Sequence, residues 1–297
     1  MTDLPISLGR LGIWTHQFED YPAAKAQETA AQLEELGFGA IWFGEAFGRE
    51  ALTHAGLLLA ATRKIVIATG VANIYVRDPM AMAGGQSTLA EAYPGRFLLG
   101  LGVSHVPLVE SRGHRYEKPV ATMRAYLEAM DGAPYRAVRP ATRPPRVLAA
   151  LGPQMLKLAA ERADGAHPYN VTPEHTAQAR AILGPGKYLC PEQAVIFETD
   201  AAKARAIGRA FLALYLTLPN YTNNFLRLGF TQEDFAGGGS DRLIDAIVAW
   251  GDAACIGERI RAHHAAGADH VCVQVLPEDP RGLPMREWRQ LAKLGTA

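Results

Sequence analysis

One stretch of the sequence, residues 64–79 (KIVIATGVANIYVRDP), restricts the possible folds more than any other. It begins with an apolar run, residues 65–68, that lacks the alternation of a half-buried strand. Such runs are typical of strands that are covered on both faces of a parallel sheet. Asp78 and Pro79 then suit the N-cap and the first turn of a helix. The stretch therefore predicts a buried strand, a loop and a helix, the order in which α/β barrels build ligand sites.

A strand followed by a helix recurs eight times along the chain. The predicted strands cover residues 11–14, 40–43, 65–68, 97–101, 147–150, 165–167, 194–198 and 270–276. The predicted helices cover residues 22–36, 51–61, 79–92, 119–130, 154–162, 173–183, 201–214, 254–266 and 286–294. This alternation implies parallel strands joined by helical crossovers. Because there are eight units and no G-x-G-x-x-G after the first strand, we expect a (β/α)8 TIM barrel rather than a doubly wound sheet.

Three segments interrupt this pattern and are expected as insertions in the loops. Residues 110–118 are polar, residues 136–146 are too rich in proline and arginine for regular structure, and residues 217–239 contain three consecutive glycines. The first and third would form walls on the substrate side, or surface and dimer contacts. Candidate lining residues in the third are Tyr221, Asn223, Asn224 and Phe225.

Composition narrows the class of protein. The 297 residues are 48% hydrophobic, and 30 basic residues balance 30 acidic ones, which argues against nucleic acid or a membrane surface as a partner. No apolar run could span a membrane, and the N-terminus lacks the features of a secretion signal. The three cysteines show no C-x-x-C spacing, and we expect Cys255 and Cys272 in the core. We predict one cytoplasmic domain, residues 1–297, that acts on a small molecule.

Polar residues follow most of the predicted strands, where barrel enzymes bind their ligands. No H-x-x-x-H or H-E-x-x-H pattern is present, so no metal site is predicted. No G-x-S-x-G surrounds a serine, which argues against nucleophilic catalysis. The turn at Leu151-Gly152-Pro153 fits either a phosphate-binding helix start or a plain strand-to-helix connection. The polar residues at the strand ends are Thr15, His16, Gln17, Glu45, Asn73, Tyr75, Ser104, His105, His167 and Tyr169.

Several ordered blocks of the sequence together resemble the luciferase-like monooxygenase superfamily. They are LGIWTHQF, FGAIWFGEAF, IVIATGVANIYVRDP, GRFLLGLGVSH, RVLAALGPQMLKLAAERADGAHPY, NYTNNFLRLGF and AGADHVCVQVLP, and they span nearly the whole chain. The sequence is most similar to the branch of coenzyme F420-dependent oxidoreductases. The resemblance implies a TIM barrel, a homodimer, and a flavin or deazaflavin at the C-terminal ends of the strands.

The resemblance also implies roles for particular residues. A bulge at Gly70, Val71, Ala72 and Asn73, often with a non-proline cis peptide in this family, would support the ring, and Gly102 and Ser104 would lie at its edge. Leu151, Gly152, Pro153 and Met155 would bind the phosphate. Trp14, Tyr75, His167 and Tyr221 are the candidates to contact the substrate, although Trp14 and Trp42 also fit the barrel interior.

Candidate catalytic residues are Glu45, His16 and His105. Glu45 matches an acidic residue of the family near the ring. In the related sugar-phosphate dehydrogenases a catalytic histidine follows that acid and a glutamate follows the fourth strand, whereas this chain has Ala46 and His105. We therefore do not expect that activity, and His105 or His16 would exchange a proton with the substrate.

Three functions remain open at this point. The first is an F420-dependent oxidoreductase that transfers a hydride to or from a small organic substrate. The second is an FMN-dependent monooxygenase with the same fold. The third is a flavin-binding or cofactor-free relative without catalytic activity. The sequence does not identify the substrate.

Overall fold

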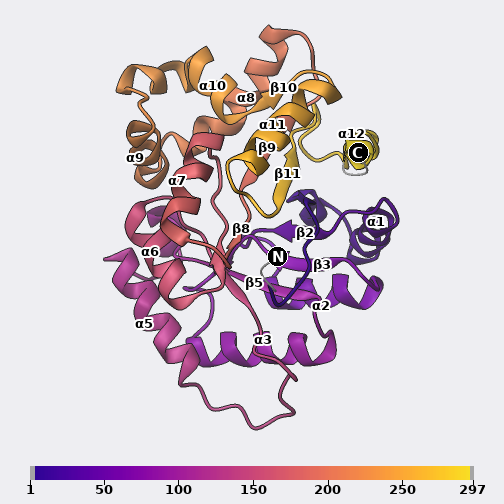
Figure 1. Cartoon of the computed structure of the whole chain (residues 1–297), viewed down its shortest axis with the longest axis vertical. Coiled ribbons are helices and arrows are strands. Elements are labelled where there is room, and N and C mark those ends of the chain that lie inside the picture. The colour runs from indigo at the N-terminus through magenta and orange to yellow at the C-terminus, as the bar shows by residue number, and fades with distance from the viewer. Residues whose placement is uncertain (1–3, 295–297) are drawn as a thin grey trace.

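The computed structural model describes residues 4–294, and its strands form one curled sheet of parallel pairs covered by helices (Figure 1). Six consecutive strands of the sheet are β1 (Leu11–Trp14), β2 (Ala40–Phe43), β3 (Val66–Thr69), β5 (Phe97–Gly102), β6 (Arg146–Leu148) and β7 (Gly165–Ala166). The helices that follow them are α1 (Ala23–Glu35), α2 (Ala51–Ala61), α3 (Pro79–Ala92), α5 (Pro119–Asp131), α6 (Pro153–Arg162) and α7 (Pro173–Leu183).

The sheet closes through a segment that Cys190 and Pro191 divide into β8 (Tyr188–Leu189) and β9 (Glu192–Ile196). β8 pairs with β7, whereas β9 pairs with β11 (Val271–Val275), which in turn pairs with β1. At the junction Cys190 N donates to Ala166 O at 3.0 Å, and Cys272 N donates to Pro191 O at 2.9 Å. The predicted TIM barrel is confirmed, but the seventh strand begins at Glu192 and not at residue 194.

A long insertion separates β9 from α11 (Ala253–Ala265) and is helical. It contains α8 (Ala201–Tyr215), α9 (Pro219–Arg227), the 3-10 helix η2 (Gln232–Gly238), α10 (Asp241–Ile247) and β10 (Ala249–Trp250). In Figure 1 helices α8, α9 and α10, in orange, lie at the opposite end of the molecule from α3. The remaining elements are η1 (Gln17–Asp20), β4 (Ala72–Asn73), α4 (Val106–Glu110) and α12 (Met285–Leu294). The sequence did not predict β4, β8 or β10, because two-residue strands carry no periodic signal.

Helix starts follow their capping residues. Asp78 accepts hydrogen bonds from Met80 N and Ala81 N at 2.9 and 3.0 Å, and Pro79 takes the first position of α3. Thr172 caps α7 in the same way before its own proline. The predicted bounds of α2, α3 and α7 are confirmed. The predicted fifth strand is wrong by one residue at its start, because Arg146 belongs to β6 rather than to the irregular loop before it.

The interior of the barrel holds its own apolar cluster, separate from the layer between strands and helices. Cys190 and Cys272 are part of this interior cluster, whereas Cys255 lies exposed in the first turn of α11. The prediction that Cys255 belongs to the core is therefore wrong. No helix within residues 4–294 is both long enough and apolar enough to cross a membrane. Other members of the interior cluster are Ile6, Leu8, Trp14, Ala40, Trp42, Val66, Ala68, Leu98, Val147 and Tyr188.

A fully buried histidine, His263, links helix α11 to helix α7 and strand β9. His263 on α11 bonds through Nδ1 to Thr176 Oγ1 at 2.8 Å and through Nε2 to Gln193 Oε1 at 2.9 Å. Burial lowers the pKa of His263 to about 3. The folded protein therefore holds this ring neutral in a pH range where the unfolded chain would protonate it.

We predict that stability falls as the pH decreases from 6.5 toward 4, because protons bind the unfolded state more readily. His263 alone contributes a slope of up to about 1.4 kcal/mol per pH unit. Urea unfolding at several pH values measures it. His263→Gln should be less stable at pH 7.5 but less sensitive to acid, whereas His114→Gln, at an exposed position, should keep the wild-type slope. An unchanged slope in His263→Gln would contradict this assignment.

Candidate active site

The chain leaves the barrel wall after β3 and forms the predicted bulge. The Gly70–Val71 peptide bond is cis, as the resemblance implied, and the chain then rejoins the sheet at β4. Ala72 and Asn73 pair with Leu101 and Gly102 of β5. The bulge thus lies at the C-terminal end of two adjacent strands.

Two glycines of β5 make room for the bulge. A Cβ on Gly102 would lie 2.4 Å from Val71 Cγ2, and a Cβ on Gly100 would lie 2.0 Å from Thr69 O. On the opposite side Trp14 Nε1 donates a hydrogen bond to Gly70 O at 3.0 Å. The position of Val71 therefore depends on the absence of side chains at two neighbouring residues.

Glu45 binds three separate parts of this region. Its Oε2 accepts from Asn73 N at 2.9 Å and its Oε1 from Ala51 N at 2.9 Å. Arg77 forms an ion pair with the same carboxylate, whose side chain is only 3% exposed. Both oxygens are engaged, so the geometry supports a bracing role for Glu45, and its predicted catalytic role stays a prediction.

His105 lies where β5 leads into α4, directly after Ser104, whose φ is +59°. The His105 ring is 5.6 Å from the ring of Tyr221, and none of residues 4–294 bonds to its buried Nδ1. Burial lowers the pKa of His105, and a hydrogen bond with Asn220 opposes the shift. His105 is therefore neutral at pH 7 and able to exchange a proton.

His16 is the second predicted catalytic histidine. It follows β1, is exposed, and has its ring 6.3 Å from that of Trp14. Partial burial lowers the pKa of His16, while Asp20 and Glu19 oppose the shift. His16 thus remains accessible at the edge of the site.

Aromatic side chains form one wall at this end of the barrel. The ring of Tyr169 lies 5.3 Å from Trp14 and 5.5 Å from Tyr215, and Tyr215 lies 4.9 Å from Tyr221. Tyr169 also donates to Gln274 Oε1 at 2.6 Å. Burial raises the pKa of Tyr215 to about 12, so its hydroxyl stays protonated at neutral pH. The sequence predicted Trp14 and Tyr221 here but not Tyr215 or Gln274.

The two remaining candidate substrate contacts, His167 and Tyr75, lie next to the bulge. His167 is 1% exposed, stacks on Trp42 at 4.5 Å and bonds through Nδ1 to Cys190 O. Its Nε2 is 2.9 Å from the place that a Cβ on Gly70 would take, so His167 lies beneath the bulge. Tyr75 is half-buried, and its N donates to Asn73 Oδ1 at 2.9 Å.

Glu192 is a buried acidic residue that the sequence analysis missed. It has no exposed surface, and its Oε2 accepts from Asn170 N at 3.1 Å. Burial raises the pKa of Glu192 to about 8, so the carboxyl is mainly protonated at pH 7. The signal in the sequence was a lone glutamate at the start of an apolar strand.

The turn Leu151-Gly152-Pro153 begins α6, with Gly152 at the N-cap. His175 Nε2 bonds to Leu151 O at 2.8 Å, which fixes the turn to α7. The Met155 side chain packs in the core, so only its backbone can face a ligand. The first N–H groups of α6 have no intrahelical acceptor, as at any helix start.

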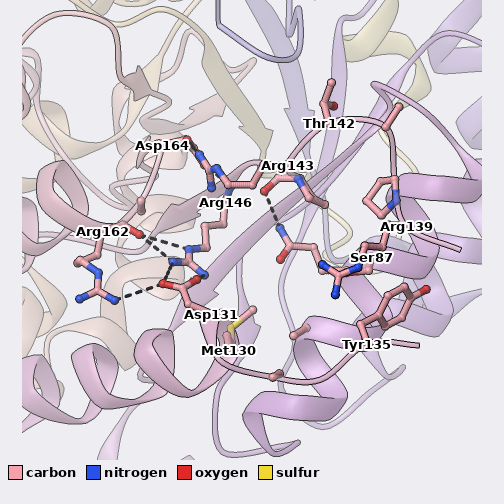
Figure 2. Close-up of a pocket in the computed structure, with 18 of the residues that line it drawn as sticks. Ser87, Met130, Asp131, Tyr135, Arg139, Thr142, Arg143, Arg146, Arg162 and Asp164 are labelled. Atoms are coloured by element: carbon pink, nitrogen blue, oxygen red, sulfur yellow. Dashed lines mark hydrogen bonds and ion pairs between the residues drawn. The ribbon is translucent and has the colours of Figure 1, made fainter. Parts of the chain in front are cut away.

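A hollow of about 750 Å³ lies at the other end of the barrel and does not match the predicted site. Its lining includes Arg146 and Asp164, which stand at the N-terminal ends of β6 and β7. Figure 2 shows Arg146 and Arg162 turned toward Asp131, and Arg143 forms an ion pair with Asp164. Each of these three arginines is thus paired with a carboxylate.

Several buried polar atoms without a partner lie near the bulge and the strand ends around it. Five of the ten described residues with such atoms, Gln17, Asn73, His105, His167 and Asn170, lie at the end of a strand or just beyond it. A polar ring with donors and acceptors on its edge would satisfy atoms of this kind. On this observation the residues at these strand ends fit a flavin-like ring. The other described residues with such atoms are His54, His175, Glu192, Asn224 and Trp288.

Comparison with protein families decides the assignment. The model of the luciferase-like monooxygenase family matches residues 6–270. The chain belongs to this family. Luciferase-like monooxygenases are oxidoreductases, so the prediction of an oxidoreductase is confirmed.

Two relatives illustrate its place among luciferase-like proteins. Rv3520c of Mycobacterium tuberculosis, provisionally named a coenzyme F420-dependent oxidoreductase, is 28% identical over 89% of this chain and 93% of its own. The 5,10-methylenetetrahydromethanopterin reductase of Archaeoglobus fulgidus is 26% identical over 80% of this chain and 85% of its own.

Solved luciferase-like structures share the fold. An F420-dependent secondary alcohol dehydrogenase in complex with an F420-acetone adduct matches with a TM-score of 0.76, 17% identity and 98% coverage of both chains. The oxygenating constituent of 3,6-diketocamphane monooxygenase from Pseudomonas putida, in complex with FMN, gives 0.73 at 13% identity, covering 97% and 96%. At these identities the likeness concerns the fold alone.

We predict that Gly102→Ala destabilises the protein by about 1–3 kcal/mol, because the new Cβ must displace Val71. The matched control is Gly84→Ala on α3, where a Cβ would meet no atom within 4 Å. That change should be neutral or stabilise the helix by up to about 1 kcal/mol. Urea unfolding measures both, and equal effects would show that the bulge does not depend on Gly102.

Proposed function

We propose that this protein is an F420-dependent oxidoreductase that transfers a hydride between the deazaflavin and a small organic substrate. The observation that carries the proposal is the Gly70–Val71 bulge, packed against Gly100 and Gly102 at the end of the barrel where family members bind their cofactor. The relative Rv3520c, whose name includes F420 and which matches 89% of this chain, supports F420 over FMN.

Residues on three sides would hold the cofactor. Val71 and the backbone of Gly70 would support the ring, and Asn73 offers a buried Nδ2 to its edge. The start of α6 at Gly152 would receive the phosphate on its free N–H groups. The Glu45–Arg77 pair keeps the bulge in place from behind.

The bound deazaflavin would supply the hydride chemistry at its ring. Hydride transfer to or from a substrate carbon leaves one proton to be supplied or removed. His105 fits this task because its Nδ1 is free of protein partners in the described chain and its lowered pKa keeps it neutral at pH 7. Tyr221 lies against its ring and limits the orientations it can take.

Two alternatives are FMN-dependent oxygenation and a non-catalytic role. A titration of the protein with F420 and with FMN tests both. We also propose a homodimer in the cytoplasm, as is usual for the family that the sequence resembles. Phe47 and Met80, at 79% and 54% exposure, are apolar side chains that an interface between subunits would cover.

We predict that the purified protein binds F420 with a dissociation constant at least about tenfold lower than that for FMN. Quenching of cofactor fluorescence measures both constants at equilibrium. Preference for FMN with oxygen consumption would favour a monooxygenase. Binding of neither cofactor would contradict the proposed function.

We predict that His105→Asn lowers kcat by about 10²–10⁴-fold while F420 affinity stays within about threefold, because the histidine acts on a proton and not on the cofactor. Turnover is followed through the absorbance of F420 against a panel of alcohols, ketones and activated alkenes. His16→Asn is the matched variant and should lower kcat much less. Loss of turnover in His16→Asn alone would assign the proton to His16 instead.

A further inference from the structure

An arginine from the insertion lies over the start of α6. A Cβ on Gly152 would be 3.6 Å from Nη2 of Arg227, the last residue of α9. This places the guanidinium beside the turn Leu151-Gly152-Pro153. The contact joins α6 and α9, between which the sequence places β7, α7, β8, β9 and α8.

Arg227 carries a charge that the protein does not neutralise. Throughout residues 4–294 it forms no ion pair with a carboxylate, and the hydrogen bond from its Nη2 goes to Asn224 Oδ1 at 3.2 Å. The Arg227 side chain is exposed overall, and burial of part of it lowers its pKa. Burial and, to a smaller extent, the charge of Arg227 lower the pKa of His175. A guanidinium without a carboxylate partner is available to bind an anion.

Asn224 supplies the second observation. Its side chain is 1% exposed, its Oδ1 is occupied by Arg227, and its Nδ2 has no partner among the described residues. Such a buried donor is costly unless a ligand accepts from it. Asn224, Arg227 and the first N–H groups of α6 together present donors and positive charge, which selects an anion over a neutral group.

The same helix also reaches the other side of the site. Tyr221 is one turn before Asn224 on α9, and its ring is 5.6 Å from His105. A helix held at its C-terminal end by an anion would therefore also hold Tyr221 against His105. The anion site and His105, the proposed proton-transfer residue, are thus connected through α9, a helix of 9 residues.

We infer that Arg227 and Asn224 clamp the phosphate group of the cofactor side chain against the start of α6, and that α9 thereby positions Tyr221 beside His105. The inference rests on the proposed function, because the phosphate belongs to the proposed cofactor. It assigns α9 to cofactor binding, whereas the sequence predicted residues 217–239 as a wall on the substrate side or as a surface or dimer contact.

The test compares cofactors with and without the phosphate. The purified protein is titrated with F420 and with the deazaflavin chromophore that lacks the phosphate, and in parallel with FMN and riboflavin. Arg227→Ala should weaken binding of the phosphorylated form about 10–100-fold and leave the phosphate-free form within about threefold. Arg227→Lys, which keeps the charge, should recover part of the loss.

The matched control is Arg242→Ala, which removes a charge from the same insertion at a side chain that is 61% exposed and paired with Asp234. It should leave all four affinities unchanged. If Arg227→Ala binds the phosphorylated form as the wild type does, or loses both forms equally, the inference is overturned and the proposed function stands. If the wild type binds none of the four compounds, the proposed function itself fails.

Discussion

The carboxylate of Glu45 is the interaction on which the candidate site most depends. It joins the start of α2, the last residue of the bulge and the guanidinium of Arg77 through one nearly inaccessible group. An ion pair of this kind adds little net stability compared with apolar packing, but removal of Arg77 would leave the buried charge of Glu45 without its cation and would cost about 3–5 kcal/mol. Its value lies in position, because three loop segments that could move separately share one anchor.

Much of the barrel could be predicted because residues at the ends of its helices and strands signal where they begin. Asp78-Pro79 and Thr172-Pro173 each combine a capping residue with a proline, and these helices begin where they were expected. Apolar runs gave β1 and β2 their bounds for a similar reason. Where Pro191 divides a strand in two, the pairing of each half depends on distant residues, and no local pattern contains that information.

The sequence could predict the location of the candidate site but not the roles of its residues. Strand ends identified His105, Tyr169 and the bulge, because topology alone brings such positions together. The partners were not predictable: Arg77 follows Glu45 by 32 residues, and Arg227 follows Gly152 by 75. Amphipathic spacing at Tyr221 and Phe225 after Pro219 could have revealed α9, whereas nothing in its sequence distinguishes Arg227 from a solvated charge.

The barrel wall has few paired residues at β7. That strand has two residues, and its register with β6 consists of the single pair Leu148–Ala166. Leu151 and Gly152 follow one side of this sparse pairing, and Tyr169 follows the other. Segments with few backbone bonds open locally before the whole protein unfolds. A ligand that contacts both segments would therefore stabilise this part of the fold against local opening. Ligand binding would then also make the protein more resistant to proteolysis.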